Sequence, residues 1–183
     1  MLIQTMMLAT AMLVVPGKPA NHHAKESIYS FKVTSLAGTA INFAEFKGKK
    51  ILVVNTASKC GFTPQYADLE KLYNQFKGKL IIVGFPCNQF AGQAPGTSKD
   101  ISEFCTNKYH ITFPMAEKIE VKGDHTAPIY QWLESEAKAK GFTPVVPQWN
   151  FGKYLLNEQG ELVAVFSSPT NPMSQEVVDA IAK

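Results

Sequence analysis

Apolar residues occur along the chain in short runs and at helical spacing, which predicts alternating strands and helices. Residues 51–55 (Ile-Leu-Val-Val-Asn) and 80–85 are short apolar runs typical of strands that are buried on both faces. Between them, residues 64–76 carry apolar side chains at helical spacing, and Pro64 is well placed in a first helical turn. The pattern therefore predicts a β-α-β unit over residues 51–85 with two parallel strands.

The segments on either side of this unit complete a predicted α/β fold. Turn residues at Ala37-Gly38 separate two short strand patterns, and three further amphipathic segments have helical spacing. We expect one hairpin to pair residues 27–33 with residues 39–43 and a second hairpin to pair residues 154–157 with residues 162–166. We expect helices over residues 98–109, over residues 127–139 and from residue 171 onward. The resulting order, a hairpin and then β-α-β-α-α-β-β-α, predicts a thioredoxin-like fold in which helices flank a central mixed sheet.

The first 24 residues differ from the rest of the chain. Residues 1–15 are mostly apolar, and the run is shorter than the roughly 20 residues that a membrane span needs. It resembles the apolar part of a secretory signal, although no Lys or Arg precedes it and no A-x-A site follows it. We therefore expect residues 1–24 to be a signal peptide or leader and residues 25–183 to be a secreted or periplasmic domain. An uncleaved anchor and a cytoplasmic leader remain alternatives.

Composition narrows the class of protein. With 183 residues, 45% hydrophobic and 18% charged, the chain suits one globular domain that does not insert stably into a membrane. The net charge of +3 is too small to indicate nucleic-acid binding. The three cysteines are an odd number and fit no zinc-binding spacing, so we expect neither a full disulfide framework nor a metal or other cofactor.

Cys60 is the leading candidate for chemistry. It falls in the turn between the first strand and the helix of the β-α-β unit, where unpaired backbone N–H groups favour an anion. Thiolate is the nucleophilic form of cysteine, and Lys59 adds a positive charge nearby. The alternative is that Cys60 is a small buried hydrophobic side chain. The polar turn around it, in which Gly61 permits tight geometry, favours the nucleophile.

Three ordered motifs resemble those of the glutathione peroxidase family. They are Asn55 to Thr63, Gly84 to Phe90 with the Gln93 that follows, and Trp149 to Leu155. The resemblance covers about residues 27–182 and implies a thioredoxin-like fold and a peroxidase, an oxidoreductase that reduces hydrogen peroxide and organic or lipid hydroperoxides. The chain departs from the family at Ala94, where the second motif usually has Glu.

The resemblance also implies the residues that surround the reactive centre. In the family a reactive cysteine or selenocysteine is surrounded by Gln, Trp and Asn, which match Cys60, Gln93, Trp149 and Asn150 of this chain. Amide and indole N–H groups can hold a thiolate and stabilise charge on a leaving alkoxide. Since position 60 is cysteine, the implied reaction oxidises its thiolate to a sulfenic acid.

Cys105 is the candidate resolving residue. The segment from Phe104 to Pro114 resembles the resolving-cysteine segment of the thioredoxin-dependent branch, which implies a Cys60–Cys105 disulfide recycled by a thioredoxin-like reductant or by glutathione. The alternative is that Cys105 fills the inward face of its helix. A disulfide needs Cα atoms within about 7 Å, so we expect the helix around Cys105 to unwind locally after oxidation. Cys87 is interpreted as structural.

The length of the segment before Trp149 indicates which branch of the family the chain resembles. Some members carry an insertion there that supports tetramers, and residues 131–148 leave no room for it. The resemblance therefore implies a monomer with an open site that accepts bulky lipid hydroperoxides. A second hypothesis is a peroxide-sensing thiol relay that oxidises a partner protein. A third, a dithiol oxidoreductase or metal chaperone, is disfavoured because the chain has no C-x-x-C.

Overall fold

The structure of the chain, a computed structural model, describes residues 27–183. The leader predicted over residues 1–24 lies outside these described residues. Two short 3-10 helices precede the main sheet, η1 (Ile28–Ser30) and η2 (Phe43–Phe46). The strands and α-helices are β1 (Lys32–Thr34), β2 (Ala40–Asn42), β3 (Lys50–Thr56), α1 (Gln65–Gln75), β4 (Leu80–Pro86), α2 (Ser98–Tyr109), α3 (Pro128–Ala139), β5 (Lys153–Leu156), β6 (Leu162–Phe166) and α4 (Gln175–Ala182).

The main sheet is mixed, with its strands in the order β4-β3-β5-β6. β3 pairs with β4 in parallel, whereas β5 pairs antiparallel with both β3 and β6. Every residue of β3 and β4 is buried, which is why both strands read as continuous apolar runs in the sequence. The predicted β-α-β unit is confirmed, and the carboxyl ends of its two strands lie at the same edge of the sheet.

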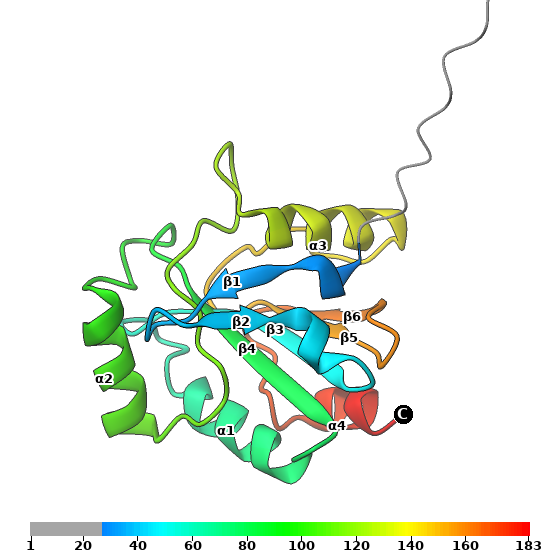
Figure 1. Cartoon of the computed structure of the whole chain (residues 1–183), viewed down its shortest axis with the longest axis horizontal. Helices are drawn as coiled ribbons and strands as arrows, with labels where there is room; N and C mark the ends of the chain where they lie inside the picture. The colour runs from blue at the N-terminus through cyan, green and yellow to red at the C-terminus, as the bar shows by residue number, and fades with distance from the viewer. Residues whose placement is uncertain (1–26) are drawn as a thin grey trace, which may run out of the picture.

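Helices cover both faces of this sheet (Figure 1). The helix α3 and the β1-β2 hairpin lie on one side, while α1 and α4 lie on the other, with α2 at the end of the molecule. Each side has its own hydrophobic core; Trp132 and Leu133 belong to one, and Leu69 and Val177 to the other. This arrangement confirms the predicted mixed sheet flanked by helices with an N-terminal hairpin.

Two predicted boundaries are wrong. The chain enters the hairpin through η1 rather than an extended strand from residue 27, because the Ser27 side chain accepts the N–H of Tyr29 and Ile28 turns into the core. The last helix begins at Gln175 rather than at Asn171, because residues 171–174 form a separate turn. In that turn, Asn171 Oδ1 accepts the backbone N–H of Met173 at 2.7 Å.

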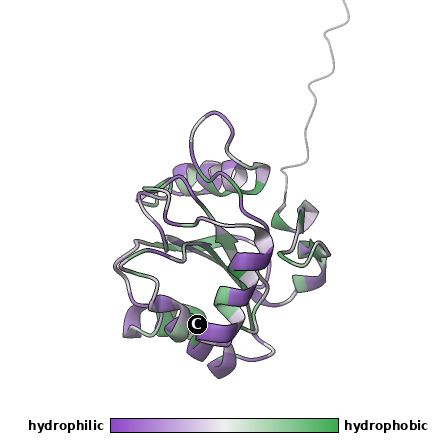
Figure 2. Cartoon of the chain, turned by 90° about the vertical axis from the view of Figure 1, so that its left-hand side faces the viewer, coloured by the Kyte–Doolittle hydropathy of each residue, from purple (hydrophilic) through white to green (hydrophobic). Residues whose placement is uncertain are grey.

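The helix α2, which carries Cys105, has well-defined ends. Thr97 and Asp100 form a capping box at its start. At its end, His110 adopts a left-handed conformation with a φ of 52°. Figure 2 shows α2 toward the viewer, with hydrophilic and hydrophobic residues alternating along the ribbon. Ile101 and Cys105 point inward, and Phe104 is half-buried.

Candidate active site

Cys60 lies in the connection between β3 and α1. The α-helix begins only at Gln65, so Cys60 occupies a tight turn before it, as expected from its position between the strand and the helix in the sequence. Thr63 holds this turn together. Its N–H donates to the Cys60 carbonyl at 3.0 Å, and its hydroxyl accepts the Cys60 N–H at 2.9 Å while donating to the carbonyl of Ala57.

The sulfur of Cys60 faces a backbone donor. The N–H of Phe62 donates to Cys60 Sγ at 3.4 Å, which stabilises negative charge on that atom. Cys60 is also the most exposed of the three cysteines, at 9%, compared with 2% for Cys105 and 0% for Cys87. All three are free thiols. Of the three buried thiols, Cys60 therefore combines the greatest exposure with a backbone N–H directed at its sulfur.

Gln93 ties the loop after β4 to the Cys60 turn. Its carbonyl oxygen accepts the N–H groups of Ser58 and Lys59 at 3.1 and 2.9 Å. Its side-chain Oε1 accepts a hydrogen bond of 2.9 Å from Nδ2 of Asn150, which is fully buried. Because the oxygen of the Gln93 amide is engaged in this way, the donors that remain on this side chain are its Nε2 hydrogens. The loops bearing Cys60, Gln93 and Asn150 thus meet at one place.

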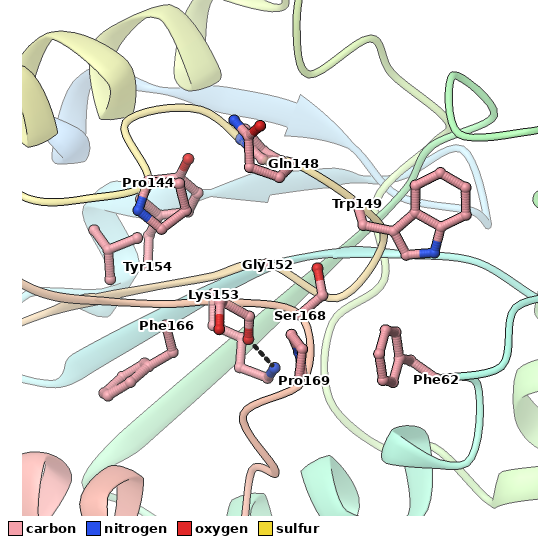
Figure 3. A pocket seen from close by; sticks show the side chains of 13 residues that line it. Phe62, Pro144, Gln148, Trp149, Gly152, Lys153, Tyr154, Phe166, Ser168 and Pro169 are labelled. Atoms are coloured by element: carbon pink, nitrogen blue, oxygen red, sulfur yellow. Dashed lines mark hydrogen bonds between the residues drawn. The ribbon is translucent and has the colours of Figure 1, made fainter.

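Trp149 lies at the open edge of this region. It is 37% exposed, and its ring lies 5.6 Å from that of Phe90. Figure 3 shows the indole and the Phe62 ring on the same side of a pocket. The sequence predicted side-chain donors around the sulfur, yet the group that reaches Sγ here is the backbone N–H of Phe62.

Asn55, which we did not single out from the sequence, fixes the Trp149 loop. Its Nδ2 donates to the carbonyl of Trp149 at 3.0 Å, and its Oδ1 accepts the N–H of Gly152 at 3.0 Å. Its backbone carbonyl accepts the N–H of Phe151, whose φ of 65° is uncommon for a bulky residue. A polar residue at the end of an apolar strand run was the available signal. Asn55 therefore connects the strand before Cys60 to the loop of the third motif.

Lys153 supports the same loop from beneath. Its side chain is fully buried, and Nζ donates to the carbonyl oxygens of Phe151 at 2.7 Å and Ser167 at 3.4 Å. Burial lowers the pKa of Lys153 to about 7, because the charged form loses its hydration. Both carbonyl contacts can be made by the neutral amine as well as by the ammonium.

The lowered pKa of Lys153 predicts a pH-dependent stability. An unfolded lysine has a pKa of about 10.4, so above pH 7 the unfolded chain binds a proton that the folded chain has released. The free energy of unfolding should therefore rise from pH 7 to 8.5, by about 1 to 2 kcal/mol. Lys153→Met should lose this rise in urea denaturation, whereas the exposed-site control Lys77→Met should keep it. Equal slopes in all three proteins would contradict the prediction.

The other two thiols are held as neutral groups. Burial raises the pKa of Cys87, and it raises that of Cys105 to about 11, an effect that the hydroxyl of Tyr66 opposes only in part. Cys87 lies directly after β4 with Sγ 3.5 Å from Gln89 Oε1. A raised pKa disfavours the thiolate, so burial makes Cys87 and Cys105 poorer candidates for the nucleophile.

Within residues 27–183, no group of three or more His, Cys, Asp or Glu side chains is placed to hold a metal ion. In the same stretch, no helix has the length and apolar character needed to cross a membrane.

Comparison with known proteins gives consistent matches. The family model described as glutathione peroxidase matches residues 28–134. The chain is 49% identical over 136 residues to the glutathione peroxidase-like peroxiredoxin gpx1 of Schizosaccharomyces pombe, covering 74% of this chain and 85% of that protein. It is 41% identical over 155 residues to the hydroperoxy fatty acid reductase gpx1 of a Synechocystis species, covering 81% and 91%.

A solved structure agrees with these sequence matches. The crystal structure of Trgpx in its apo form superposes with a TM-score of 0.65 at 36% sequence identity. The match covers 86% of this chain and 97% of Trgpx.

Proposed function

This chain belongs to the glutathione peroxidase family and is a peroxidase, and we propose that Cys60 is the residue that attacks the hydroperoxide. The observation that carries this proposal is the contrast between the three thiols. Cys60 is the most exposed and receives a hydrogen bond at sulfur, whereas Cys87 and Cys105 are buried thiols with raised pKa values.

In the proposed reaction, the Cys60 thiolate attacks one oxygen of ROOH. An S–O bond forms as the O–O bond breaks, and the leaving alkoxide takes up a proton and departs as ROH. Cys60 is thereby oxidised to a sulfenic acid by two electrons. We assign the Gln93 amide and the Trp149 indole as donors that stabilise the leaving oxygen, and Asn150 as the residue that orients Gln93 through its 2.9 Å hydrogen bond.

Cys105 is the proposed resolving residue. Its thiolate would attack the sulfenic sulfur of Cys60, forming an S–S bond and releasing water after protonation of the departing hydroxide. A thioredoxin-like dithiol would then reduce the disulfide, with glutathione as the alternative reductant. The similarity to a protein named a peroxiredoxin supports the dithiol route. We further propose that the chain acts as a monomer.

Steady-state kinetics of the wild-type protein test this function. With thioredoxin, its reductase and NADPH, the protein should consume many equivalents of hydroperoxide per Cys60, and glutathione should support a slower rate. The competing hypothesis is a peroxide-sensing relay, which would stop after one equivalent and accumulate a mixed disulfide with a partner. A single turnover with every reductant offered would therefore reject the peroxidase cycle.

A further inference from the structure

A pocket of about 180 Å³ opens beside the candidate active site. Figure 3 shows Phe62 and Trp149 at one end, with Pro144, Tyr154 and Phe166 at the other. The pocket is therefore built from the Cys60 turn, the loop before Trp149 and the two antiparallel strands β5 and β6. Of the residues given mechanistic roles above, Trp149 borders this space, and Cys60, Gln93, Asn150 and Cys105 do not line it.

The pocket wall is chemically apolar. Aromatic rings, prolines and Val165 supply most of it, and two of the polar groups that line it are engaged with the backbone. The hydroxyl of Tyr154 donates to the carbonyl of Val145 at 3.0 Å. The amine of Lys153 is fully buried and donates to two backbone carbonyls, so it is not presented to a ligand. The pocket thus offers hydrocarbon contact without a charged group for recognition.

Phe62 connects this wall to the reacting sulfur. Its backbone N–H donates to Cys60 Sγ at 3.4 Å, and its ring forms part of the pocket. Trp149, the proposed donor to the leaving oxygen, borders the same space. A molecule with an apolar group in the pocket would therefore extend toward Cys60 along Phe62.

We propose that this pocket, the Phe62–Trp149 pocket, binds the hydrocarbon arm of an organic hydroperoxide. Its volume is comparable to that of an engineered apolar cavity of about 150 Å³ that accepts benzene, so it takes one ring or a short alkyl segment. The proposal rests on the proposed function and adds the part of the substrate that the protein recognises. Recognition is of hydrocarbon, not of a carboxylate or a headgroup.

Filling the pocket tests the proposal. Val165→Phe, in the pocket wall on β6, should raise KM for cumene hydroperoxide about tenfold while the rate with hydrogen peroxide stays at the wild-type value. Val163→Phe is the matched control, since Val163 is 41% exposed on the same strand and lies outside the wall. Val163→Phe should change neither the KM for cumene hydroperoxide nor the rate with hydrogen peroxide.

The possible outcomes distinguish failure of the proposed peroxidase function from failure of the proposed hydrocarbon-binding pocket. A wild-type protein that consumes neither peroxide would reject the proposed function. An unchanged KM for cumene hydroperoxide in a Val165→Phe protein that still reduces hydrogen peroxide would reject the pocket alone. If Val165→Phe fails to fold, Val165→Thr serves in its place, because it keeps the volume and should raise the same KM several-fold by adding a hydroxyl to the apolar wall.

Inhibition by alkyl compounds distinguishes recognition of the hydrocarbon from recognition of a charged headgroup. Octanoate and its uncharged methyl ester should inhibit reduction of cumene hydroperoxide with similar inhibition constants, and Val165→Phe should weaken both about tenfold. Inhibition by the carboxylate alone would overturn the proposal, because it would show recognition of charge rather than of the alkyl chain.

Discussion

Replacing Cys60 by serine should reduce hydroperoxide consumption by about 10⁴-fold or more, whichever reductant is supplied. A serine hydroxyl at this position is not ionised at neutral pH and cannot form a sulfenic acid. The substitution exchanges one atom and leaves intact the backbone hydrogen bonds between residue 60 and Thr63 that define the turn. The loss should therefore come from the chemistry, with the circular dichroism spectrum and the melting temperature close to those of the wild type.

Cys87→Ser is the matched control for this experiment. Cys87 follows the adjacent strand β4, but it is fully buried and burial raises the pKa of its thiol. Its replacement should leave the rate of peroxide reduction within a few-fold of wild type, at some cost in stability. Substantial turnover by Cys60→Ser would reject Cys60 as the nucleophile. If Cys87→Ser lost as much peroxidase activity as Cys60→Ser, the experiment would not identify Cys60, rather than Cys87, as the nucleophile.

The fold could be predicted in outline from the sequence because its central strands are buried on both faces. The apolar runs that became β3 and β4 have few alternative structures when a helical segment of suitable length lies between them. The N-terminal boundary could not be predicted in this way. Alternating residues from Ser27 fit a strand as well as a capped 3-10 turn, and the choice depends on Ile28 being buried against other parts of the chain.

The candidate site was predicted less completely than the fold. Motifs identified the loops of Cys60, Gln93 and Asn150, and the structure brings these loops together. The donor at the sulfur is the N–H of Phe62, and a backbone group leaves no signature in residue type. The contacts of Asn55 reach residues more than ninety positions away, so their existence depends on the sheet pairing and not on local pattern.

Cys105→Ser should separate the first oxidation from turnover. Stopped-flow measurements should show Cys60 oxidised by one equivalent of peroxide at the wild-type rate, after which steady-state reduction with thioredoxin falls about 100-fold or more. The oxidised protein should carry a sulfenic acid that dimedone traps, visible by mass spectrometry, whereas the wild type should carry an intramolecular disulfide. Cys87→Ser should behave as the wild type. Normal turnover of Cys105→Ser with thioredoxin would reject Cys105 as the resolving residue.

The surroundings of Cys105 explain why resolution should also require α2 to open. The thiol is 2% exposed and its pKa is about 11, so in place it is both inaccessible and almost entirely protonated near pH 7. The capping box of Thr97 and Asp100 holds the first turn of the helix, so opening should begin at the other end, near the left-handed His110. Amide hydrogen exchange over residues 104–110 should accelerate in the disulfide form while residues 98–101 change little. Equally slow exchange of residues 104–110 in the reduced and disulfide forms would show that the cysteines meet without unwinding α2.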